Sequence, residues 1–130
     1  QERRGDIWQT VEEPLDLVSA LKEASSAESA VLVDCLTLWL SNLMTLSRDI
    51  EHETASLTAA FPYLTGPIIF VTNEVGLGIV PANDLARAFR DHAGRLNQAV
   101  AAKADRVTMM ISGLPMTLKN EFENERTPRV

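Results

Sequence analysis

The sequence predicts an α/β domain in which helices flank a mostly parallel sheet. Residues 68–71 (IIFV) form a continuous apolar run, three of whose residues are β-branched. Such a run is typical of a strand buried on both faces of a parallel sheet. Residues 30–33 make a second buried strand, and residues 106–111 (RVTMMI) predict a last one. The segments between these runs carry apolar residues at helical spacing.

In the first half of the chain we expect one more strand and two helices. Residues 7–11 (IWQTV) alternate apolar and polar residues, as a half-buried strand does. Residues 14–24 predict an amphipathic helix, because its proline suits the first helical turn. The composition of residues 25–29 indicates a loop. Residues 36–47 are apolar over more than one helix face, which favours burial on several sides, as at a subunit interface.

In the second half, residues 55–64 predict a helix that ends before Gly66 and Pro67. A longer helix follows residues 68–81, capped by Asn83 or Asp84. Its buried stripe is predicted to be Leu85, Phe89, Leu96 and Val100. Residues 112–115 are expected to turn out of the last strand, and residues 120–130 to form a polar, flexible tail. One domain over residues 1–119 is therefore expected.

Asp91 and Arg95 are spaced to form an ion pair on this long helix. Its arginines Arg87, Arg90 and Arg95 lie mostly off the buried stripe. A solvated face is favoured for them. The alternative is that one or two turn toward a bound phosphate.

Composition restricts the function classes. The chain has a net charge of −6, so it is not expected to bind nucleic acid in general. A single cysteine, Cys35, excludes an intrachain disulfide and favours a reducing compartment. No apolar run approaches the ~18 residues of a membrane span, and no signal sequence opens the chain. We therefore expect a cytoplasmic protein.

Polar residues follow two of the predicted strands. Asp34 comes directly after residues 30–33, where phosphate-handling α/β proteins place a carboxylate that holds Mg²⁺. The alternative is that Asp34 only caps the next helix. Asn73 and Glu74 follow residues 68–71, where ligands gather in open α/β sheets. Gly76 and Gly78 would allow close approach of a ligand, although two turn glycines in an ordinary crossover are an equal alternative.

Neither the two histidines, nor the single cysteine, nor Ser112 lies in the sequence context of a common catalytic nucleophile. His52 and His92 have no partner at metal-ligand spacing and are expected at the surface. Cys35 has no adjacent base and is expected to pack in the core. Ser112 lacks the G-x-S-x-G context of a hydrolase.

Taken together, five segments resemble one known family. They are RR-x-x-x-W at 3–8, TVEEPL at 10–15, VLVDCLTLWLSNL at 31–43, VTNEVGLGIVP at 71–81 and DLARAFRD-x-AGRLNQ at 84–98. The series resembles the bifunctional adenosylcobinamide kinase / adenosylcobinamide-phosphate guanylyltransferases of cobalamin biosynthesis. The similarity covers residues 3–119.

The resemblance implies a P-loop NTPase-like, RecA-type fold. It also implies two reactions, in which a nucleoside triphosphate, ATP or GTP, phosphorylates adenosylcobinamide and GTP guanylylates a histidine. The GMP then passes to adenosylcobinamide phosphate, giving adenosyl-GDP-cobinamide. Mg²⁺ is the implied cofactor, and a homotrimer is the implied assembly.

The sequence departs from the family in one respect. It contains no G-x-x-x-x-G-K-[ST] phosphate loop. The family's guanylylated histidine, in an R-I-x-x-H context, would fall immediately before Gln1. We therefore expect that the first strand and phosphate loop are missing, and that these 130 residues alone are inactive and poorly soluble. The alternative is a non-catalytic nucleotide-binding or assembly module derived from this fold.

The resemblance assigns no catalytic residue within the chain. It places nucleotide-binding residues at Gln1, Glu2, Arg3, Arg4, Glu12 and Asp34. Arg3 and Arg4 would pair with phosphates, and Glu12 would recognise the base or ribose. Asp34 would contact the nucleotide and Mg²⁺, a role that the resemblance favours over capping.

Overall fold

The structure is a computed structural model that describes residues 7–124 of the chain. Its helices are α1 (Leu17–Ala24), α2 (Leu36–Thr45), α3 (Ile50–Ala60), α4 (Asp84–Lys103) and α5 (Glu121–Asn124), with short 3₁₀ turns at Phe61–Tyr63 and Val75–Leu77. Its strands are β1 (Val31–Asp34), β2 (Ile68–Val71), β3 (Arg106–Ile111) and β4 (Leu114–Asn120). The expected α/β class is confirmed.

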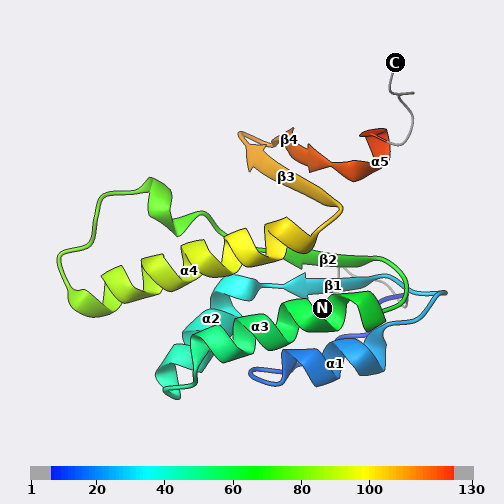
Figure 1. Ribbon diagram of the computed structural model, residues 1–130, viewed down its shortest axis with the longest axis horizontal. Helices are drawn as coiled ribbons and strands as arrows, with labels where there is room; N and C mark the ends of the chain where they lie inside the picture. The colour runs from blue at the N-terminus through cyan, green and yellow to red at the C-terminus, as the bar shows by residue number, and fades with distance from the viewer. Residues whose placement is uncertain (1–6, 125–130) are drawn as a thin grey trace.

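The strands form two separate pairs. β1 and β2 are parallel, with Val31 opposite Ile68 and Asp34 opposite Val71. β3 and β4 form an antiparallel hairpin, which stands apart from the first pair at the end of α4 (Figure 1). The expectation of a mostly parallel sheet is thus met only by β1 and β2 within the described residues.

A leucine-rich core joins the helices. Six leucines from α1 to α4 are almost fully buried: Leu21, Leu36, Leu40, Leu43, Leu57 and Leu96. Each stabilises the fold by about 1.5–3 kcal/mol relative to an exposed side chain. The Trp39 indole N–H donates to the carbonyl of Leu15 at 2.8 Å, which ties the segment before α1 to α2. The central helix α2 therefore organises the first half of the chain.

The β1–β2 pair buries one face only. Val31, Val33, Ile68 and Phe70 pack against the leucine core. The alternate residues, Leu32, Ile69 and Val71, are exposed. The expectation that residues 68–71 are buried on both faces is wrong for the described part of the chain, because the helices cover a single face of the pair.

Several predicted boundaries are corrected by local hydrogen bonds. α1 begins at Leu17 and not at Pro14, because Asp16 caps it by accepting from the Ser19 amide at 3.2 Å. The carboxylate of Glu13 accepts from the amides of Leu15 and Asp16, both at 2.8 Å, and so holds the chain in a turn there.

The third helix starts earlier than its sequence pattern suggests. α3 begins at Ile50 and not at residue 55, because Asp49 accepts from the His52 amide at 3.0 Å. Its cap outweighs the poor apolar pattern of its first turn, where Glu51 and Glu53 also suit the helix dipole.

The predicted first strand is absent. Residues 7–11 have no regular structure, and Ile7 is 91% exposed. An alternating pattern forms a strand only where another strand pairs with it, and none within residues 7–124 does so here.

The end of the chain is more regular than expected. The turn after β3 is limited to Ser112 and Gly113, which have φ of 53° and 77°. Positive φ at both central residues suits a two-residue hairpin, so Leu114 and Pro115 already belong to β4. Asn120 ends β4, α5 follows, and residues 125–130 of the expected tail lie outside the described residues.

Two expectations for α4 also change. Of the two expected caps, Asn83 is the one observed and accepts from the Ala86 amide at 2.8 Å, while Asp84 is the first residue of the helix. Leu85 is 72% exposed, so it does not belong to the buried stripe. Asp91 pairs with Arg90 at 3.0 Å and not with Arg95.

Gly66 and Gly94 provide a matched test of the fold. Gly66 has φ of +75°, and a Cβ there would overlap the carbonyl oxygens of Ser26 and Ser29. Gly94 lies inside α4, with nothing within 4 Å of a Cβ. We expect Gly66→Ala to lower the free energy of unfolding by about 2 kcal/mol or more, and Gly94→Ala to raise it by about 0.5–1 kcal/mol. Urea denaturation of the complete gene product measures both. Shifts of the same sign in the two variants would contradict the structure.

Candidate active site at the carboxyl edge of β1 and β2

The parallel pairing of β1 and β2 brings two polar segments to one edge. Because Asp34 lies opposite Val71, residues 35–37 and 72–74 leave the sheet at the same place. Ligands of open α/β sheets bind outside such carboxyl ends. This carboxyl edge is the candidate site.

A hydrogen-bonded network fixes the edge. The backbone and side-chain amides of Asn73 both donate to the Thr37 hydroxyl, each at 3.1 Å. The Thr72 hydroxyl donates to Asn97 Oδ1 at 2.7 Å. Asn97 Nδ2 in turn donates at 3.2 Å to both the Asn73 carbonyl and the Glu74 carboxylate. The network therefore connects β2 to α2 and α4 and orients Glu74.

Three residues of this network, Thr37, Thr72 and Asn97, were not singled out from the sequence. Asn97 follows Leu96 directly and lies three residues before Val100, beside the buried stripe of α4. A polar side chain next to a buried stripe needs a hydrogen-bond partner, so the position of Asn97 was a usable signal.

Asp34 lies at this edge with an exposed side chain. It does not cap α2, because the cap is Cys35, whose Sγ accepts from the Leu38 amide at 3.4 Å. The capping alternative is therefore wrong, and so is the expectation that Cys35 is simply a core residue. The carboxylate of Asp34 remains available to a ligand.

No group of three or more His, Cys, Asp or Glu side chains within residues 7–124 is arranged to hold a metal ion. A single carboxylate still suits Mg²⁺, which commonly binds through one or two carboxylates together with substrate phosphates. The donor chemistry of Asp34 fits that mode.

The loop after the edge is open. Every residue from 71 to 80 is exposed, and Ile79 is 99% exposed. Gly76 and Gly78 have no positive φ, so a sharp turn does not require them. A Cβ on Gly76 would come within 3.9 Å of the Arg90 side chain, so this glycine lies against α4.

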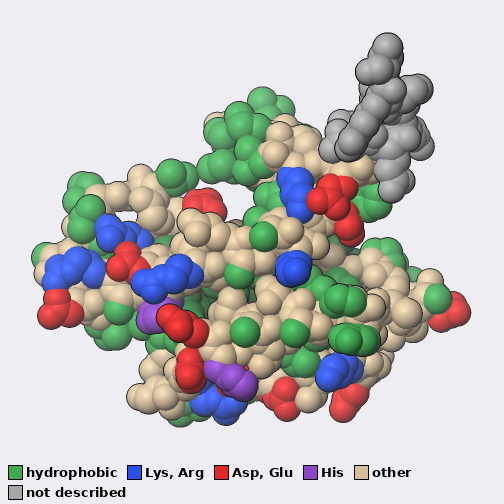
Figure 2. All heavy atoms as spheres, in the orientation of Figure 1, with side chains coloured by type: hydrophobic (Ala, Val, Ile, Leu, Met, Phe, Trp, Pro, Cys, Tyr) green, Lys and Arg blue, Asp and Glu red, His purple; other side chains and the backbone are tan. Residues whose placement is uncertain are grey.

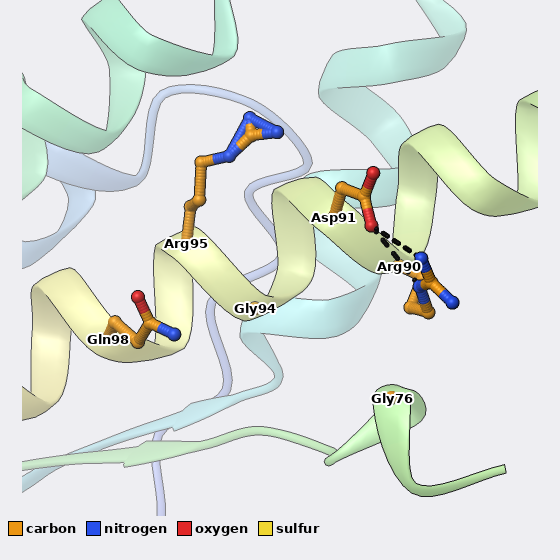
Figure 3. Close-up of a pocket in the computed structure, with 6 residues that line it drawn as sticks. All are labelled: Gly76, Arg90, Asp91, Gly94, Arg95 and Gln98. Atoms are coloured by element: carbon orange, nitrogen blue, oxygen red, sulfur yellow. Dashed lines mark hydrogen bonds and ion pairs between the residues drawn. The ribbon is translucent and has the colours of Figure 1, made fainter.

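The arginines of α4 differ in their surroundings. Arg87 pairs with Asp84 and donates to the carbonyls of Pro81 and Ala82, which closes the loop onto the helix. Arg90 donates to Asp91. Arg95 forms no salt bridge with any residue in the described range. With Asp91, Gly94, Gln98 and Gly76, Arg90 and Arg95 line a hollow of about 430 Å³ (Figure 3).

The remaining residues considered in the sequence analysis either are not part of the carboxyl edge or lie outside the described residues. Gln1, Glu2, Arg3 and Arg4 lie outside the described residues. Glu12 is exposed in the irregular segment before α1. His52 is exposed on α3 and His92 is half-buried on α4. Neither histidine belongs to the network at the carboxyl edge.

A model of the cobinamide kinase / cobinamide phosphate guanyltransferase family matches residues 1–118 of the chain. The chain belongs to this family. The resemblance seen in its sequence segments is thereby confirmed. The matched residues include the carboxyl edge, the loop after it and the whole of α4.

Three relatives support the assignment. The bifunctional adenosylcobalamin biosynthesis protein CobP of Pseudomonas aeruginosa is 46% identical over 92% of this chain and 70% of its own length. The corresponding CobU proteins are 36% identical in Salmonella typhimurium and 35% in Escherichia coli. These matches cover 86% and 89% of this chain, and 70% and 72% of the relatives.

No helix in residues 7–124 combines the length and the apolar character that crossing a membrane requires.

Asn97 provides a test of the edge network. We expect Asn97→Ala to accelerate amide hydrogen exchange in residues 72–77 about tenfold, because two or three bonds worth ~0.5–1.5 kcal/mol each are lost. Asn42→Ala is the matched control, since its amide donates to the Pro14 carbonyl at 3.0 Å, away from the edge. Equal exchange at residues 72–77 in wild type and Asn97→Ala would show that the network does not hold the edge.

Proposed function

We propose that this chain forms most of an enzyme that phosphorylates adenosylcobinamide and then converts the product to adenosyl-GDP-cobinamide. The observation that carries the proposal is the family match over residues 1–118. The polar edge of β1 and β2 supports it, because such edges hold nucleotides in α/β proteins.

The first reaction is a phosphoryl transfer. The aminopropanol hydroxyl of adenosylcobinamide attacks the γ-phosphorus of ATP or GTP, loses its proton and releases the nucleoside diphosphate. Positioning and charge neutralisation supply most of the catalysis in such reactions. Mg²⁺, when bound, neutralises charge on the phosphates. Asp34 would hold it together with the nucleotide, and the Thr37–Asn73–Asn97 network keeps the adjacent backbone fixed.

The second reaction is a guanylyl transfer in two steps. A histidine nitrogen attacks the α-phosphorus of GTP and releases pyrophosphate, forming a P–N bond. A phosphate oxygen of adenosylcobinamide phosphate then attacks the same phosphorus and frees the histidine. A covalent intermediate divides one difficult exchange into two easier ones.

We place this histidine immediately before Gln1, as the family pattern requires. Arg3 and Arg4 would then pair with the GTP phosphates, and Glu12 would accept from the base or ribose. The sequence has no G-x-x-x-x-G-K-[ST] motif, and the relatives are longer than the matched region. We therefore propose that the 130 residues alone are inactive and that the complete protein is the enzyme.

We also propose a cytoplasmic homotrimer. Leu38 in the first turn of α2 and Leu46 at its C-cap are both more than half exposed, which supports a contact through this helix. The alternative function is a non-catalytic nucleotide-binding or assembly module derived from the same fold.

GMP transfer gives the decisive test. Intact mass spectrometry of the complete gene product, incubated with GTP and Mg²⁺, is expected to show a gain of one GMP. A phosphoramidate is stable to base and released by acid, which distinguishes it from an ester. The 130-residue chain alone should gain nothing. Absence of the adduct in the complete protein, with a histidine verified before Gln1, would favour the non-catalytic module.

Asp34 is tested by charge removal. We expect Asp34→Asn to lower kcat for adenosylcobinamide phosphorylation by about 10²-fold or more and to raise the Mg²⁺ concentration needed for half-maximal rate. Glu28→Gln is the matched control, because Glu28 is an exposed carboxylate in the loop before β1. Wild-type kinetics in Asp34→Asn would remove Asp34 from the metal site.

A further inference from the structure

A second, larger hollow adjoins the one shown in Figure 3. It has a volume of about 800 Å³ and lies between α2, the loop after β2 and the first half of α4. Its apolar walls are Met44, Val75, Pro81, Leu85 and Phe89, with a few polar groups among them. Ligand sites of ~300–1,000 Å³ with apolar walls and few polar groups are typical of small-molecule binding.

The smaller hollow has a different character. It is lined by Arg90, Asp91, Gly94, Arg95 and Gln98 on α4 and by Gly76 in the loop after β2 (Figure 3). The protein carries a net charge of −6, yet blue Lys and Arg side chains gather over α4 in Figure 2, with red ones between them. In the smaller hollow, two guanidinium groups outnumber the single carboxylate of Asp91, and this excess of positive charge on an acidic protein favours an anion there.

Arg90 belongs to the walls of both hollows, which therefore meet at its side chain. Its Nε and Nη2 donate to Asp91 at 3.2 and 3.0 Å. A guanidinium has five N–H donors, so Arg90 keeps donors for a ligand while Asp91 holds its position. Figure 3 shows this pair joined at one end of the hollow, with Arg95 extending from α4 one turn away.

The smaller hollow also lies next to the carboxyl edge. Gln98 follows Asn97, the residue that holds the Glu74 carboxylate. Gly76 is two residues beyond Glu74. The order in space is therefore apolar hollow, Arg90, polar hollow and nucleotide edge.

We propose that the two hollows together form the acceptor site, with the body of the corrinoid in the apolar hollow and its phosphate on Arg90. The assignment rests on the proposed function. A corrinoid acceptor combines a large body, which gains from apolar contact, with a flexible arm that ends in a hydroxyl or a phosphate. In this arrangement the body of the corrinoid lies away from the carboxyl edge, and the end of its arm points toward the nucleotide.

The two acceptor substrates of the enzyme allow the apolar hollow and Arg90 to be tested separately. Both adenosylcobinamide and its phosphate need the apolar hollow, but only the phosphate needs Arg90. In the complete protein we expect Arg90→Gln to raise KM for adenosylcobinamide phosphate in guanylyl transfer about tenfold, since one charge-assisted contact is lost. KM for adenosylcobinamide in the kinase reaction should change by less than about twofold.

The apolar hollow is tested by Leu85→Glu, a substitution that the fold tolerates because Leu85 is 72% exposed. It should raise KM for both acceptors by about tenfold, because a charge then faces the body of the corrinoid. Arg48→Gln and Leu114→Glu are matched controls. Arg48 is paired with Glu53, Leu114 is 70% exposed on β4, and neither lines a hollow.

GMP adduct formation from GTP needs no acceptor and is measured in every variant. Failure of the wild type to form the adduct would count against the proposed function itself. With the adduct intact, equal KM changes for both acceptors in Arg90→Gln would overturn the phosphate contact. Unchanged KM values in Leu85→Glu would overturn the apolar part. A smaller assembly of Leu85→Glu in sedimentation would also overturn it, by showing that a second copy covers the hollow.

Discussion

The structure depends on the burial of one face of a two-stranded parallel sheet. Val31, Val33, Ile68 and Phe70 point into the leucine core, and Phe70 stacks on Phe61 with ring centroids 5.2 Å apart. This contact fixes which way both strands face the helices. Because the strands run in the same direction, it also decides that their polar ends meet at one edge. The candidate site follows from that geometry before any catalytic side chain is considered.

Helix α4 connects the carboxyl edge to the two hollows. Its Leu96 and Val100 anchor it to the core, while Asn97 between them holds the carboxyl edge. Earlier turns carry Arg90 and line both hollows. Because α4 is a continuous helix, the spacing between the carboxyl edge and the two hollows is set by the helix and not by flexible loops.

The sequence was sufficient for the elements with strong local signals. Continuous apolar runs located β1 and β2, and Asn83 located the start of α4. It was insufficient where long-range context decides: an alternating pattern does not reveal whether a partner strand pairs with residues 7–11. At the site, Asp34 and Glu74 were visible as polar residues after strands. The position of Asn97 beside the buried stripe indicated only that it needs a hydrogen-bond partner, because its partners lie 23–25 residues away.

Because both faces of the β1–β2 pair are apolar, the apolar pattern does not by itself determine the register of the two strands. Shifting one strand by a single residue exchanges Ile68 and Phe70 for Ile69 and Val71, which are equally hydrophobic. Apolar pattern alone thus discriminates poorly against such a slip. Contacts at the start of the strands add to the Phe70–Phe61 contact in fixing the alignment: the Val31 amide donates to the Pro67 carbonyl at 2.9 Å, and Gly66 lies against the carbonyl oxygens of Ser26 and Ser29. Gly66, in the loop before β2, therefore helps to set the register in which the two strands pair.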